Sequence, residues 1–185
     1  MVDVGVGPKP ANQILVAGHP LVQILKTEGT VTEMKPGRLV IQGTNDDDVS
    51  IAGVFAVNSM AVGWLGYEQT IKKHRPATVD TAYLVDAQVA VLNGGGFRIV
   101  AALQASQGTL KKGDALVMGT NGCVKKAAVA TATPASGTTA VVSTSAQPAI
   151  PVAGTFGSDG PIVAYAEETI ADVAEIADIM VRSVI

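Results

Sequence analysis

Few side chains in this sequence are suited to acid–base or nucleophilic chemistry. The chain has two histidines, His19 and His74, and one cysteine, Cys123. A hydrolase centred on His19 would need a nucleophile, and no Gly-x-Ser-x-Gly motif supplies one. His19 precedes a proline in an apolar stretch, which favours a turn residue, while His74 lies among three cationic residues, which favours a surface residue. We therefore expect no catalytic residue, and a hydrolase built around His19 is the least favoured hypothesis.

Two short motifs offer groups that ions bind. Residues 45–48, Asn-Asp-Asp-Asp, carry oxygen ligands of the kind Ca²⁺ prefers, but the Gly and Glu that complete a calcium loop are missing. Residues 93–96, Asn-Gly-Gly-Gly, could present backbone N–H groups to a phosphate, but no Lys-Ser/Thr pair follows. A solvated acidic turn and a hairpin turn are the better interpretations. One cysteine also excludes a cysteine-rich zinc site and an internal disulfide, so we expect no metal and no cofactor.

The charge balance limits the kinds of partner. Lys and Arg number 13 against 16 Asp and Glu, a net charge of −3, whereas proteins that coat nucleic acid normally carry an excess of cations. The basic residues 72–75, Lys-Lys-His-Arg, lack interleaved aromatic residues that would stack on bases, which favours a solvated loop, with an acidic protein partner as the rival. No apolar run is long enough to span a bilayer, and the first residues lack a secretory signal. We expect a soluble protein that binds neither nucleic acid nor membrane.

The composition predicts a mainly β fold. Of the 185 residues, 48% are hydrophobic, 16% charged and 4% aromatic, with abundant Gly, Ala, Val and Thr. This balance favours short strands joined by glycine turns, and the chain is long enough to bury a core without a disulfide or a metal. We expect small barrel-like or sandwich-like β units.

A stretch that occurs twice indicates how these units are organised. Residues 34–45 align without a gap to residues 110–121, 76 positions later, with Lys, Gly, Gly, Thr and Asn in register. A weaker echo relates residues 63–71 to residues 162–170, 99 positions later. Repetition of a turn-strand-turn unit indicates architecture rather than chemistry, because a catalytic site seldom appears twice in one small chain.

The expected layout has four parts. We expect an extended N-terminal arm over 1–13, a first β unit over 14–87, and a second over 88–185 with an insertion at 127–155, packed together as one body. The strongest hairpin signal is residues 87–103, where Asn-Gly sits between two apolar runs, and a second hairpin is expected over 115–127. Further strands are expected over 14–17, 21–25, 39–41, 49–54, 62–67, 139–142 and 149–152. A short helical turn is expected over 171–177, followed by a closing strand.

Several of these motifs, taken in order, resemble a known family. They are a Lys-x-Gly turn and a Gly-Thr-Asn turn around a strand, Val-Ala-Val-Leu-Asn-Gly-Gly-Gly, Leu-Lys-Lys-Gly-Asp-Ala-Leu-Val, Asn-Gly-Cys-Val-Lys-Lys-Ala, and Ala-Tyr-Ala-Glu-Glu-Thr before an apolar strand. The sequence over 88–126 and 161–185, and to a lesser extent over 34–71, is similar to head decoration or capsid cement proteins of tailed double-stranded DNA viruses. The chain is longer than the compact members of that family.

The resemblance implies a structural role in a virion. It implies a β-rich protein that is not an enzyme and that clusters, commonly as homotrimers, on the outer surface of an icosahedral capsid assembled in the host cytoplasm. The partner it implies is the major capsid protein, which the N-terminal arm would contact. The arm residues concerned are Val2, Val4, Val6, Pro8, Lys9 and Pro10.

Physical reasoning adds candidate contact residues and one alternative function. Large aromatic side chains dominate many interfaces, so Trp64, Tyr67, Phe55 and Phe97 are the candidate anchors, although each could simply fill the core. The alternative function is a β-barrel module that binds a ligand such as carbohydrate, because barrels of that kind use similar turns.

Overall fold

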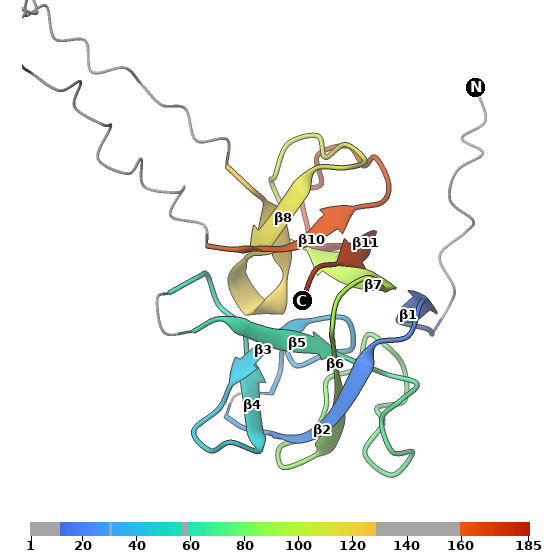
Figure 1. The fold of residues 1–185 in the computed structure, drawn as a ribbon, viewed down its shortest axis with the longest axis vertical. Coiled ribbons are helices and arrows are strands. Elements are labelled where there is room, and N and C mark those ends of the chain that lie inside the picture. The colour runs from blue at the N-terminus through green and yellow to red at the C-terminus, as the bar shows by residue number, and fades with distance from the viewer. Residues whose placement is uncertain (1–11, 30, 57–58, 129–159) are drawn as a thin grey trace, which may run out of the picture.

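A computed structural model describes residues 12–29, 31–56, 59–128 and 160–185. In this part of the chain the structure is almost entirely β and consists of two small five-stranded barrels, one above the other in Figure 1. The mainly β fold built from barrel-like units is therefore confirmed. Most of the predicted arm, the strands predicted at 139–142 and 149–152, and most of the predicted insertion lie outside the described residues.

Each barrel closes through one parallel pair of strands. The first has the order β2-β4-β3-β5-β6, and the second has the order β7-β9-β8-β10-β11 with β11 returning to β7. The strands of the first barrel are β2 (Leu21–Thr27), β3 (Leu39–Gln42), β4 (Asp48–Ile51), β5 (Ala61–Leu65) and β6 (Gln88–Asn93). Those of the second are β7 (Arg98–Leu103), β8 (Ala115–Met118), β9 (Val124–Lys126), β10 (Ile162–Ala166) and β11 (Ala177–Ser183). A short strand, β1 (Leu15–Ala17), adds to the outer edge of β7, and a 3₁₀ turn, η1 (Thr120–Gly122), joins β8 to β9.

The two barrels have the same topology, strand for strand. In the first, β2 pairs with β4 in parallel and with β6 antiparallel, and β7 pairs with β9 and β11 in the same way. The remaining antiparallel contacts, β4–β3–β5–β6 and β9–β8–β10–β11, also correspond. The repeat seen in the sequence is therefore a duplication of a whole barrel.

Individual backbone hydrogen bonds recur at corresponding positions. The Gly66 amide donates to the Ala90 carbonyl at 2.8 Å, and the Glu167 amide donates to Met180 at 2.9 Å. The first echo keeps its offset of 76, since β3 and β8 begin at residues 39 and 115. The second echo is two positions out of register, because β5 and β10 begin at residues 61 and 162, an offset of 101 rather than 99. Three further amide-to-carbonyl bonds of the first barrel each have a counterpart in the second: Glu28 to Val49 matches Gln104 to Val124, Gly43 to Asp48 matches Gly119 to Cys123, and Leu65 to Arg38 matches Ala166 to Asp114.

The hairpin predicted over residues 87–103 is wrong. Strand β6 pairs with β2 and β5 of the first barrel, whereas β7 pairs with β1, β9 and β11 of the second. Residues 93–96 therefore form the connection between barrels, and the boundary falls after β6 rather than before it. Gly94, Gly95 and Gly96 all have positive φ, so the Asn-Gly signal marked a tight turn correctly. The two strands on either side of this turn, β6 and β7, do not pair with each other.

Two further expectations have different outcomes. The hairpin over 115–127 is confirmed, since β8 and β9 pair antiparallel across η1. The helical turn predicted over 171–177 is wrong, whereas the closing strand after it is confirmed as β11. The segment before β11 forms hydrogen bonds to the loop after β7 rather than the internal bonds of a helical turn. The Ser106 amide donates to the Val173 carbonyl, and the Gly108 amide donates to the Asp172 carboxylate.

A continuous apolar core joins the barrels into one body. One cluster of buried residues fills the second barrel and includes Leu39, Trp64 and Leu92 of the first. The Trp64 indole N–H donates to the Ser183 hydroxyl on β11 at 3.0 Å. The interior of the first barrel has a smaller cluster of its own, made of Met34, Val40, Val49, Leu65, Tyr83, Ala87, Val89 and Val91. Trp64 of the first barrel and Ser183 of the second are thus buried together where the two barrels meet.

Candidate functional site

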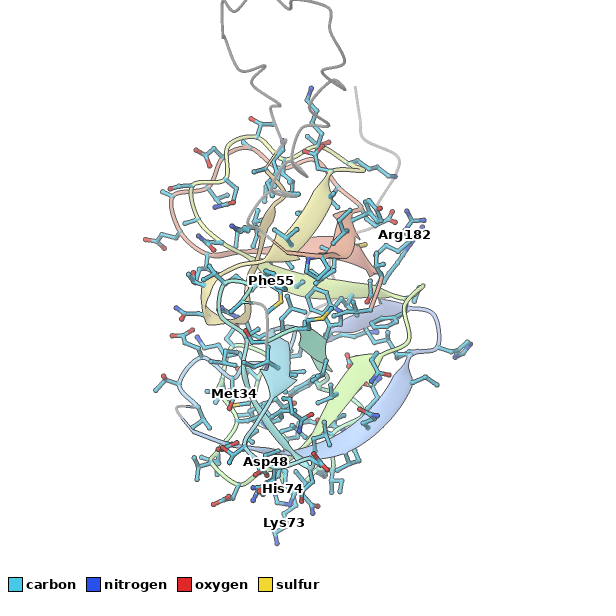
Figure 2. The ribbon with its side chains drawn as sticks, turned by 60° about the vertical axis from the view of Figure 1, so that its left-hand side comes forward. Met34, Asp48, Phe55, Lys73, His74 and Arg182 are labelled. Atoms are coloured by element: carbon cyan, nitrogen blue, oxygen red, sulfur yellow. The ribbon has the colours of Figure 1, made fainter. Side chains whose placement is uncertain are left out.

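The residues considered for catalysis lie in separate places. His19 is exposed in the turn between β1 and β2, and His74 lies with Lys73 at the far end of the first barrel in Figure 2. Cys123 is buried where the barrels meet. Among the described residues, no group of three His, Cys, Asp or Glu side chains is placed to hold a metal ion.

The single thiol takes part in the junction between barrels. Arg38, the residue immediately before β3 in the sequence, is almost fully buried. Its Nη1 donates to the Asn121 carbonyl and to Cys123 Sγ, both at 2.8 Å. Burial raises the pKa of the Cys123 thiol, with the Arg38 charge acting in the opposite direction. The Gly122 amide in the same turn donates to the Ala52 carbonyl at 2.6 Å. The η1 turn therefore docks on the first barrel, and its buried thiol is held neutral.

The acidic turn at residues 45–48 closes on itself. Asp48 is buried, its carboxylate accepts a hydrogen bond from the Asn45 side-chain Nδ2 at 2.6 Å, and it lies 3.2 Å from the Lys26 ammonium. The Asn45 hydrogen bond is the main cause that lowers the Asp48 pKa, and Lys26 adds to it against the effect of burial. Asp46 and Asp47 are exposed. This geometry supports the structural interpretation of the turn.

Two amides of the glycine turn at residues 93–96 already donate to the backbone. The Gly95 amide donates to the Ile185 carbonyl at 2.9 Å, and the Gly96 amide donates to Ser183 at 3.0 Å. A Cβ at position 95 would lie 2.8 Å from the Val184 carbonyl oxygen. The turn thus holds the end of the chain against the connection between barrels, and these two N–H groups are not directed at an anion.

The basic loop at residues 72–75 is only partly a surface charge cluster. The Arg75 guanidinium donates to the Glu68 and Thr70 carbonyls and lies 5.3 Å from the centre of the Tyr67 ring. Lys72 and Lys73 are exposed. Arg75 is therefore used in contacts within the loop after β5, and Lys72 and Lys73 are the cations of this loop that are exposed to solvent.

The candidate anchor residues divide into two groups. Trp64 and Phe97 are fully buried in the shared core and are not available as exposed contacts. Tyr67 and Phe55 are half-buried, and the Tyr67 hydroxyl donates to the Ala77 carbonyl at 3.2 Å. Phe55 lies near the junction in Figure 2. The candidate arm residues Val2, Val4, Val6, Pro8, Lys9 and Pro10 lie outside the described residues.

A charged hollow at the junction was not anticipated from the sequence. It has a volume of about 350 Å³ and is lined by residues of both barrels. Its charged members are Glu33, Lys35, Arg38, Asp80 and Asp178. None of its lining residues is aromatic, a histidine or a cysteine, so it offers charge and hydrogen bonds but no nucleophile. These residues are scattered along the sequence, and only the docking of the barrels brings them together.

A second unanticipated feature is a buried hydroxyl pair in the first barrel. Tyr83 donates to the Gly66 carbonyl and lies 3.2 Å from Thr70 Oγ1, which accepts from the Ala90 amide at 3.0 Å. Burial raises the Tyr83 pKa to about 12. These groups satisfy backbone atoms where β5 ends, a structural role that explains why a tyrosine is buried there.

The fold and its junction define a duplicated small-β-barrel protein with a shared core. Among the described residues, none of the helical segments is long and apolar enough to cross a membrane. Neither a protein-family model nor a curated protein matches the sequence.

Proposed function

We propose that this chain is a structural virion protein that binds the outer surface of an icosahedral capsid and bridges neighbouring shell subunits. The observation that supports the proposal best is the fusion of two barrels of the same topology into one body through a shared core. A protein that joins neighbouring copies of one subunit benefits from holding two such barrels at a fixed spacing. The shared core through Trp64 and the docked η1 turn supply that fixed spacing.

The proposed attachment uses many weak contacts of one kind. A capsid repeats its surface, so a small contact on each subunit is multiplied by avidity. The N-terminal segment, with Val2, Val4 and Val6 alternating before the prolines, is proposed to add to an exposed strand of the major capsid protein. Homotrimers are the proposed unit, and we propose no catalytic activity.

Deleting residues 1–11 tests the attachment. Because the described body begins at Asn12, we expect the shortened protein to keep its thermal unfolding midpoint and to lose cosedimentation with empty capsids. The matched control replaces Asp3 by Asn, which keeps the alternating valines and should keep binding. Equal occupancy of the capsids by the shortened and full-length proteins would remove the segment from the proposal.

A carbohydrate-binding module remains the alternative proposal. The junction hollow would be its binding site, because Glu33, Lys35 and Asp178 could hydrogen-bond sugar hydroxyls. The lack of an aromatic lining residue counts against it, since aromatic faces commonly support sugar rings. A glycan array gives the test: specific binding that Asp178→Asn abolishes would favour this function over the structural one.

A further inference from the structure

The outer edge of β2 has little covering in the first barrel. Strand β6 pairs with β2 along its length, from Leu21 opposite Asn93 to Lys26 opposite Gln88. On the other side, β4 pairs with β2 only at Lys26 and Thr27. In the described part of the chain, residues 21–25 therefore have a strand along one side only. Figure 1 shows β2 running along the outside of the lower barrel.

The alternation of the strand identifies the residues that face this edge. The Thr27 amide donates to the Ala87 carbonyl on the β6 side, whereas the Lys26 amide donates to the Asp47 carbonyl on the β4 side. Backbone groups alternate in direction along a strand, so Val22 and Ile24 direct theirs to the same side as Lys26. Two residues thus present their N–H and C=O groups along an edge that has no strand partner among the described residues.

The side chains at this edge are apolar and exposed. Leu21 is 67% exposed, Val22 45% and Ile24 46%. The sequence Leu-Val-Gln-Ile-Leu over residues 21–25 carries no charge. Edge strands are normally protected by charges, prolines or bulges, because unpaired edges bind other strands. Here, such protection is found only at the two ends, in Pro20 and Lys26.

The duplicated barrel shows what the same edge can accept. Val100 of β7 lies 76 positions after Ile24 and occupies the corresponding place in the second barrel. There β1 covers the edge antiparallel, and the Val100 amide donates to the Ile14 carbonyl at 2.9 Å. The second barrel therefore accommodates an added antiparallel strand at this position, and among the described residues the first barrel leaves the corresponding position open.

We propose that β2 pairs with β2 of a second copy of the chain, antiparallel about a two-fold axis at Gln23. In this register, Val22 faces Ile24 of the second copy, and both outward residues of each strand are used. A shift in one direction would place Pro20, which has no N–H, opposite Ile24. A register shift in the opposite direction would pair Lys26 with Val22 of the second copy, but the Lys26 amide already donates to the Asp47 carbonyl. The sequence thus allows one fully paired register.

The side chains of this register are mutually compatible. Val22 meets a β-branched isoleucine, Leu21 meets Leu25, and Gln23 meets its own copy, with no like charges directly opposed. The contact is short, so the association in solution is weak and depends on concentration. A two-fold contact cannot build a trimer, and it would therefore link one trimer to the next. The strand pairing does not depend on the proposed capsid role.

Disulfide trapping with Gln23→Cys tests the axis directly. The two cysteines would face each other across a non-hydrogen-bonded pair with a Cα separation of about 4.5 Å, which a disulfide spans. We expect a disulfide-linked dimer to form at least ten times faster than with Gln88→Cys, an exposed position on the neighbouring strand. Buried Cys123 stays in place, and wild-type protein should give no dimer. Equal rates for Gln23→Cys and Gln88→Cys would overturn the pairing.

Mixing two variants tests the register. Val22→Cys mixed with isotopically labelled Ile24→Cys should give mainly the mixed dimer by mass spectrometry, and each alone should give little. Predominant self-dimers would contradict the register.

Sedimentation of the Ile24→Lys variant tests the association without a disulfide. Ile24 lies outside the core, so the variant should stay folded by circular dichroism while losing the concentration dependence of the wild-type sedimentation coefficient. No wild-type concentration dependence, or the same dependence in Ile24→Lys, would contradict the proposal. Trapping through Gln23→Cys that appears only after residues 1–11 are deleted would also overturn it, because the edge would then belong to the N-terminal segment.

Discussion

Replacing Ser183 by Ala should weaken the link between the barrels by an amount that the structure sets. The Trp64 indole N–H is fully buried and donates to Ser183 Oγ at 3.0 Å, so the substitution leaves a buried donor without its acceptor. An unsatisfied buried donor costs about 1–3 kcal/mol. For a chain of this length, that corresponds to a fall of roughly 2–12 °C in the unfolding midpoint.

A double-mutant cycle separates this hydrogen bond from other effects. Trp64→Phe removes the donor, so Ser183→Ala in that background should cost at least about 1 kcal/mol less than in the wild type. Urea unfolding, followed by circular dichroism, gives all four free energies. Equal costs of Ser183→Ala in the two backgrounds would refute the reasoning, because the serine would then act without the tryptophan.

Two further predictions test other parts of the structure. Gly37 and Gly113 occupy corresponding turns at φ +79° and +91°, but a Cβ would lie 2.5 Å from the Val100 carbonyl oxygen at Gly37 and in open space at Gly113. Urea unfolding should therefore show that Gly37→Ala destabilises more than Gly113→Ala by about 1–3 kcal/mol, and equal losses would contradict the clash. Tyr83 has a pKa raised to about 12 by burial, so its contribution to stability is full below its unfolded pKa near 10 and falls as the pH rises toward 12. Tyr83→Phe should show a smaller loss of unfolding free energy between pH 9.5 and 11.5 than the wild type, and an unchanged loss would contradict the assignment.

The sequence predicted the strands better than their pairing. Short apolar runs located β2 and β3, and the two Lys-x-Gly turns revealed the duplication through their constant spacing. The partners of β6 and β7 were missed because the Asn-Gly turn reports the local backbone, whereas pairing depends on which barrel each strand joins. The repeat itself held the information, since β6 and β11 occupy the same place in their barrels.

The candidate site was predicted less completely for a similar reason. Trp64 and Phe97 have the size of interface anchors, but a chain with 4% aromatic residues uses them to fill its shared core. The junction hollow is lined by Arg38, whose guanidinium also reaches the η1 turn, a contact between residues 83 positions apart that no local pattern encodes. The open edge of β2 is recognisable only by comparison with β7, whose corresponding edge is covered by β1.

The proposed role is tested most directly by the number of copies that bind to an empty capsid, of the tailed-virus kind that the proposal requires as partner. Titration followed by sedimentation should reach a plateau at a fixed ratio of this protein to shell subunits, and the occupied capsids should disassemble at a higher temperature than bare ones. Absence of binding, or binding that does not saturate and leaves the disassembly temperature unchanged, would contradict a function in capsid decoration.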